Sequence, residues 1–194
     1  MSAAPPPLTI RALQATAVEV PMTYALGTSR QRVTAAPLLL LDLLTEEGVT
    51  GSAYLFCYLR GAAAAIATMV KEVDRAVKGD AVVPLDLWRK LATRFALIGV
   101  QGVVRMAMAG LDVAAWDTLA IAAGLPLVRL MGGEPKPVTA YNSCGLGLMD
   151  DPQGGGRRSG KAARRRLPCH QAAARLSDGA AGSRRARRRA QARR

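Results

Sequence analysis

Hydrophobic and polar residues alternate at the start of the chain and then give way to longer apolar runs, a pattern typical of β-strands. Residues 8–20 alternate, with apolar side chains on one face. Residues 36–45 are almost continuously apolar, as expected of a strand covered on both faces. Residues 49–58 follow a turn and are rich in types that suit a pleated surface. The pattern predicts an antiparallel three-stranded meander, with a mobile polar loop over residues 21–35.

Helical periodicity replaces the strand pattern after residue 60. Residues 61–78 and 84–95 carry apolar positions at helical spacing, and the second segment has Pro84 in its first turn. Residues 103–123 give the strongest pattern, with one apolar face at steps of three and four. A short helix and a further strand over residues 138–143 complete the predicted order. Strands followed by helices predict the α+β class, here a meander followed by a helical bundle.

Charge divides the chain at residue 150. Residues 1–150 contain 13 Lys and Arg against 12 Asp and Glu, whereas residues 151–194 contain 14 against 2. The second part has clustered arginines, three consecutive glycines and no apolar periodicity. It holds too little apolar surface to pack, so we expect it to be disordered.

The cysteines and the apolar runs bear on the compartment. Cys57, Cys144 and Cys169 are widely spaced and form no CxxC pair, which argues against a disulfide framework or a zinc site. The first residues have neither a basic start nor an apolar stretch of the secretory kind. The longest dense apolar run falls far short of the ~20 residues that span a bilayer. We therefore expect a cytoplasmic protein with no membrane partner.

Several segments, in continuous order over residues 8–148, resemble the amino-terminal domain of mandelate racemase. They include VPMTY from residue 20, APLLLLDL from residue 36 and GSAYLFCY from residue 51. The longest is RMAMAGLDVAAWD from residue 105, and GLPL from residue 124 leads to MGG and PVTAYNS. The resemblance extends to muconate lactonizing enzymes and the enolase superfamily, in which an α+β capping domain precedes a (β/α) barrel. It implies a capping domain over 1–135 and the first barrel strand over 136–150, and the change in charge sets 151–194 apart as a basic tail.

The resemblance also implies a chemistry. Enzymes of this superfamily abstract the proton next to a carboxylate, and Mg²⁺ stabilises the resulting enediolate. Intact relatives are racemases, epimerases or dehydratases of hydroxy acids or sugar acids, and the resemblance leaves open whether they are oligomers. It places four cap residues over a small carboxylate substrate: Tyr24, Leu26, Val33 and Tyr58. Packing against neighbouring residues is the alternative role for Leu26 and Tyr58.

The residues after the predicted first barrel strand are too few for the barrel that the resemblance implies, so we expect the catalytic barrel to be missing. Only 57 residues remain from Val138, whereas a barrel takes at least about 200. The metal site of the superfamily needs three carboxylates from successive strands, and only Asp151 and Asp178 follow Asp150. The remaining bases, Lys161 and His170, are not in strand-like segments. We therefore assign no catalytic residue and no metal ligand, and expect no turnover from this chain alone.

The tail has the composition of a shifted reading frame. When each codon is read one nucleotide late, residues 170–179 permit the sequence IKLRLGYPT, and residues 160–169 permit EKLLAAGFR. Both resemble the segment of mandelate racemase that follows the first barrel helix and carries its Lys-x-Lys motif. This hypothesis places the slip between about Gly147 and Gln153.

Two other functions compete with a truncated enzyme. A basic, arginine-rich tail binds phosphates, but this one lacks the aromatic residues that stack on bases, so we expect no specific nucleic-acid partner. The other is a stand-alone capping domain that acts as an interaction module. Asp112 and Asp117 lie in the strongest helix, five residues apart, and capping or pairing within the domain explains them better than metal binding.

Overall fold

The computed structural model describes residues 7–27 and 32–138. Of these, residues 7–25 and 32–134 form one compact unit, and residues 26–27 and 135–138 belong to a second unit. Three strands, β1 (Ile10–Gly27), β2 (Arg32–Thr45) and β3 (Thr50–Phe56), form a sheet in the order β1-β2-β3. The sheet is antiparallel, so the predicted meander is confirmed.

The first two strands are longer than predicted. Residues 21–27 belong to β1 and residues 32–35 to β2, so the loop predicted over residues 21–35 is wrong at both ends, and 28–31 lie outside the described residues. Pro21 and the polar residues favoured a loop. However, β1 is an edge strand, where proline is tolerated because one side of the strand needs no donor. Pairing with a neighbouring strand outweighs local composition here.

A short turn joins β2 to β3 and fixes their register. The Thr45 hydroxyl donates to the Val49 carbonyl at 2.9 Å and accepts from the Val49 N–H at 3.0 Å, while Gly48 takes a φ of 82°. Thr45 is buried, so these bonds satisfy a hydroxyl that has no access to water. The register pairs Leu40 with Tyr54 and, further along, Leu38 with Phe56.

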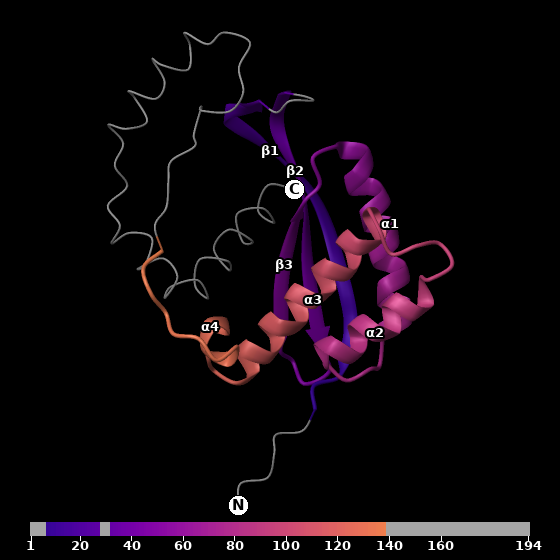
Figure 1. The fold of residues 1–194 in the computed structure, drawn as a ribbon, viewed down its shortest axis with the longest axis vertical. Coiled ribbons are helices and arrows are strands. Elements are labelled where there is room, and N and C mark those ends of the chain that lie inside the picture. The colour runs from indigo at the N-terminus through magenta and orange to yellow at the C-terminus, as the bar shows by residue number, and fades with distance from the viewer. Residues whose placement is uncertain (1–6, 28–31, 139–194) are drawn as a thin grey trace, which may run out of the picture. The chain divides into compact units, whose positions relative to one another are not determined.

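Helices cover one face of this sheet (Figure 1). They are α1 (Arg60–Val77), α2 (Pro84–Arg94), α3 (Val103–Ala122) and the short α4 (Leu127–Leu130), as predicted to within a few residues. α3 packs along β3 and β2, and α1 and α2 pack against α3. The strand predicted over residues 138–143 begins at Val138, which has no regular secondary structure, and continues outside the described residues, as does the whole tail.

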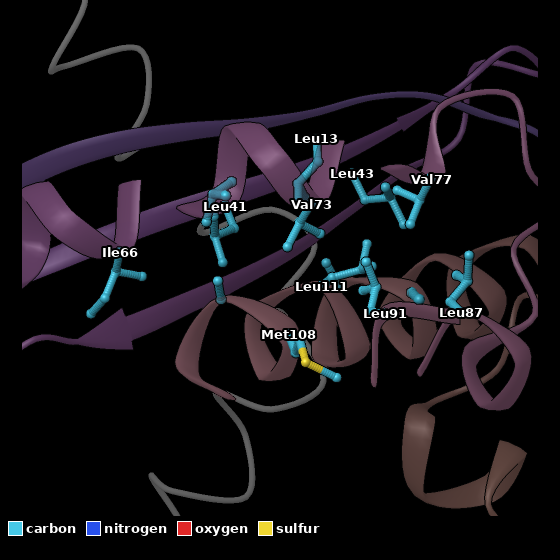
Figure 2. Packing of buried hydrophobic residues seen from close by; sticks show 14 of the residues in the cluster. Leu13, Leu41, Leu43, Ile66, Val73, Val77, Leu87, Leu91, Met108 and Leu111 are labelled. Atoms are coloured by element: carbon cyan, nitrogen blue, oxygen red, sulfur yellow. The ribbon is translucent and has the colours of Figure 1, made fainter. Parts of the chain in front are cut away.

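The core lies between the inner face of the sheet and the helices. Leu39, Leu41 and Leu43 of β2 are fully buried, and Figure 2 shows Leu41 and Leu43 beside core residues of the helices. The outer face is different: Leu40 is 38% exposed and its partner Tyr54 is 68% exposed. The prediction that both faces of this strand are covered is therefore wrong for the described part of the chain. A continuous apolar run shows that both faces of a strand are apolar. It does not show whether another element of the protein packs against each face.

Two glycines bring α3 close to the sheet. A Cβ at Gly51 would lie 2.1 Å from Thr118 Oγ1 and 2.2 Å from the Ala114 carbonyl oxygen. A Cβ at Gly110 would lie 2.2 Å from Leu41 Cδ1. The helix therefore rests directly on the backbone of β3, at a separation that only a residue without a side chain permits.

Carboxylates from the helices bind backbone N–H groups of both outer strands. Asp74 of α1 accepts from the Leu13 N–H of β1 at 2.6 Å, and Asp117 of α3 accepts from the Ser52 N–H of β3 at 2.8 Å. Unpaired N–H groups along a sheet edge are templates for strand addition. The helices α1 and α3 therefore both pack on the sheet and protect its edge strands, β1 and β3.

Candidate functional site

Of the four predicted cap residues, Tyr24, Val33 and Tyr58 fall at one end of the meander, and Leu26 belongs to a second unit of the chain. Tyr24 and Leu26 belong to the last residues of β1, Val33 is the second residue of β2, and Tyr58 follows β3 by two residues. In an antiparallel meander the end of the first strand, the start of the second and the end of the third meet at the same end of the sheet. The side chains of Tyr24 and Leu26 lie outside the described part of the structure.

The two remaining cap residues, Val33 and Tyr58, differ in their position along the strand direction and in burial. β2 pairs with β3 only from Leu38, opposite Phe56, so its first residues extend past the end of β3. Val33 lies five positions before Leu38, which at ~3.3 Å per residue places it roughly 17 Å further along the strand. Val33 is buried, whereas Tyr58 is 55% exposed. Topology thus brings Tyr24, Val33 and Tyr58 to one end of the sheet, with Val33 well beyond the level of Tyr58.

Tyr58 has an unusual backbone and an aromatic neighbour. Its φ of 60° is the one positive value at a non-glycine residue within 7–27 and 32–138. Its ring meets the Phe56 ring edge to face, with centroids 4.6 Å apart and planes at 72°. Sequence reasoning missed Phe56. Strand alternation could have indicated it, because residues two apart lie on the same face of a strand.

A charged pair links two elements just beyond Tyr58. Arg60, the first residue of α1, donates through Nη2 and Nε to the Glu19 carboxylate of β1, at 2.6 and 2.9 Å. Because Arg60 is largely exposed, such a pair contributes at most about 1 kcal/mol to stability. Its effect at the site is to neutralise both charges.

The acidic residues of α3 have roles inside the domain. Asp117 binds the Ser52 N–H, which confirms the predicted pairing within the domain. Burial raises the pKa of the Asp112 carboxyl, and a hydrogen bond to Trp116 opposes that shift. No group of three His, Cys, Asp or Glu side chains in the described residues is arranged to hold a metal ion. Mg²⁺ is held mainly by carboxylate oxygens in near-octahedral geometry, and the described residues do not fit that requirement.

The other residues considered from sequence lie elsewhere. Asp151, Lys161, His170 and Asp178 are outside the described ranges. Cys57 is buried just after β3, and burial raises the pKa of its thiol. As for the membrane, no helix in the described ranges combines the length and the apolar character needed to cross one.

Comparison with known proteins yields consistent matches. Residues 9–132 match the model of the mandelate racemase / muconate lactonizing enzyme N-terminal domain. A crystal structure of an enolase from Bradyrhizobium, complexed with magnesium and mandelic acid, is 40% identical with a TM-score of 0.66, over 70% of this chain and 38% of that one. An enolase from the α-proteobacterium BAL199, with bound magnesium, is 32% identical with a TM-score of 0.74, over 82% and 44%.

A curated relative matches over a similar length of chain. The L-talarate/galactarate dehydratase of Salmonella typhimurium is 28% identical over 127 residues, which cover 64% of this chain and 31% of the dehydratase. The chain therefore spans about a third of the length of this relative and less than half of each of the two solved structures.

Proposed function

The chain belongs to the mandelate racemase / muconate lactonizing enzyme family through its N-terminal domain, and from this membership we propose that it is the capping domain of a Mg²⁺-dependent enzyme of the enolase superfamily. The observation that carries the proposal is the agreement between the matched region, residues 9–132, and the compact unit of the structure. The reaction class is removal of the proton next to the carboxylate of a hydroxy acid or sugar acid.

In this proposal the domain contributes binding and leaves bond breaking to the rest of the enzyme. Tyr24 and Tyr58 offer hydroxyls that donate to substrate oxygens, and Leu26 and Val33 supply an apolar wall that keeps water away. The relatives that match carry magnesium with mandelic acid in one case, and dehydrate talarate or galactarate in another. A small carboxylate of this kind is the substrate class we assign to the intact enzyme.

The chain alone is proposed to be inactive. Its described residues offer no metal site, and the tail lies outside them. The test is deuterium incorporation next to the carboxylate of mandelate and galactarate in D₂O with Mg²⁺. The Salmonella dehydratase serves as a positive control on galactarate. We expect no incorporation by the purified chain above buffer, and incorporation above that level would overturn the proposed inactivity.

A shifted reading frame in the tail is proposed as the origin of the short barrel segment. Sequencing the gene tests it: an open, family-like frame beneath residues 160–180 is expected. If the nucleotide sequence contains no such frame, the hypothesis is wrong.

An interaction module is the second candidate, and the outer face of the sheet favours it. Leu40 and Tyr54 face solvent side by side on β2 and β3. In a complete protein an exposed apolar patch marks a surface that binds a partner. In an incomplete protein the same patch causes self-association. Gel filtration of the whole chain separates the two cases. A stable monomer supports the module, and concentration-dependent association supports the incomplete enzyme.

A further inference from the structure

Tyr58 occupies the apex of a strained turn. The Leu59 N–H donates to the Cys57 carbonyl at 2.7 Å, so a hydrogen bond closes around the single residue Tyr58. That bond pattern defines a γ-turn, and the φ of 60° makes it the positive-φ form, the mirror image of the common inverse γ-turn. The positive-φ form is rare and strained for a residue that carries a Cβ.

Both sides of the turn are anchored. Cys57 is buried, and its N–H donates to the Pro37 carbonyl of β2 at 2.9 Å. On the other side the Leu59 carbonyl accepts from the Ala63 N–H at 3.0 Å, which begins the hydrogen bonding of α1. The sheet and the helix thus fix the two ends, and the residue between them must adopt the strained conformation. Strain of this kind persists only where the surroundings impose it, and it concentrates at functional sites.

The domain itself gains little from having tyrosine at this position. Glycine would adopt the same φ without steric cost. Tyr58 is more than half exposed, and the contact described for its ring is the edge-to-face one with Phe56. A residue that strains the backbone without filling the core is better explained by what its side chain presents to solvent.

We infer that the γ-turn at Tyr58 is an orienting device, in which Phe56 is a positioning residue that holds the tyrosine ring in one direction at the site end of the sheet. The identity of the ligand, a small hydroxy carboxylate whose oxygens accept from the phenol, rests on the proposed function. The existence of the device does not, because it follows from the turn, its anchors and the ring contact.

Urea unfolding of the whole chain tests the strain. Tyr58→Gly is expected to raise the unfolding midpoint above wild type, and Tyr58→Ala to lower it, because alanine keeps the strain and loses the ring contact. Thr34, exposed on β2, is the matched control: there glycine is expected to be less stable than alanine, since its backbone is extended. If Tyr58→Gly is no more stable than Tyr58→Ala, the claim that the backbone at position 58 is strained is wrong.

The orientation of the ring needs a separate measurement. NMR couplings of selectively labelled tyrosine report the χ1 rotamers of Tyr58. We expect a single rotamer in wild type and averaging in Phe56→Leu, with a single rotamer retained in Tyr58→Phe when labelled phenylalanine replaces labelled tyrosine. Averaging in wild type, or one rotamer in Phe56→Leu, would refute the positioning role. None of these readouts requires a substrate, so failure of the proposed enzymatic function would leave them unchanged.

Discussion

Replacing Gly51 by alanine is expected to force α3 away from the sheet. The new Cβ would lie 2.2 Å from the Ala114 carbonyl oxygen and 2.6 Å from the Thr118 N, in addition to its contact with the Thr118 hydroxyl. Rotating a side chain cannot relieve two contacts with backbone atoms. The helix must therefore shift, and its buried residues lose contact with β2 and β3.

The size of the effect follows from two contributions. Overpacking a well-packed interior costs about 1–3 kcal/mol. A shift that exposes roughly 40 Å² of apolar surface adds about 1 kcal/mol. The sum, about 2–4 kcal/mol, is a large fraction of the ~5–15 kcal/mol that stabilises a typical domain. In urea this corresponds to a midpoint lowered by about 1–2 M, for a slope near 2 kcal/mol per M.

Two controls isolate the cause. Gly61→Ala places a Cβ in open space within α1 and is expected to stabilise the domain by about 0.5–1 kcal/mol. Adding Thr118→Ala to Gly51→Ala removes only the hydroxyl contact, so it should restore little of the loss. A Gly51→Ala midpoint within error of wild type would refute the close approach of α3, and complete rescue by Thr118→Ala would refute the role of backbone contacts.

Three further predictions concern carboxylates. Asp117→Leu removes the acceptor of the Ser52 N–H and is expected to cost about 1.5–3 kcal/mol in urea unfolding and to accelerate amide exchange at Ser52, with Asp117→Asn retaining part of the protection. The hydrogen bond from the Thr9 N–H lowers the pKa of the Glu47 carboxyl in the folded state. The contribution of this hydrogen bond to stability is therefore present above the unfolded pKa and is lost as pH falls through the folded pKa. Glu47→Gln should flatten that part of the plot of stability against pH. Burial raises the pKa of Asp112, so the folded state binds more protons and stability falls as pH rises from the unfolded to the folded pKa; Asp112→Asn should therefore be more stable than wild type at neutral pH and lose that advantage in acid.

The order of elements was predictable because periodicity is a local signal. The long helix over residues 103–123 and the turn before β3 depend on residues close together in the chain, and both predictions are confirmed. The extent of β1 and β2 was not predictable, because Pro21 and the polar residues after it gain strand structure only through a neighbouring strand. The prediction that the outer face of β2 is covered was wrong for a related reason. The sequence shows that Leu40 is apolar, but it does not show whether another element packs on it, and Leu40 is partly exposed.

The site was less accessible to sequence reasoning than the fold, and Tyr58 shows why. Its family resemblance indicated a contact residue, but the conformation that makes it unusual arises from two separate elements, β2 and α1. The Pro37 carbonyl of β2 holds Cys57, the first hydrogen bond of α1 holds Leu59, and the strain falls on the residue between them. No local preference of tyrosine favours a positive φ, so propensity predicts the opposite of what is observed. Such a conflict between local preference and tertiary structure is expected at functional sites, and it is the observation on which the proposed role of Tyr58 rests.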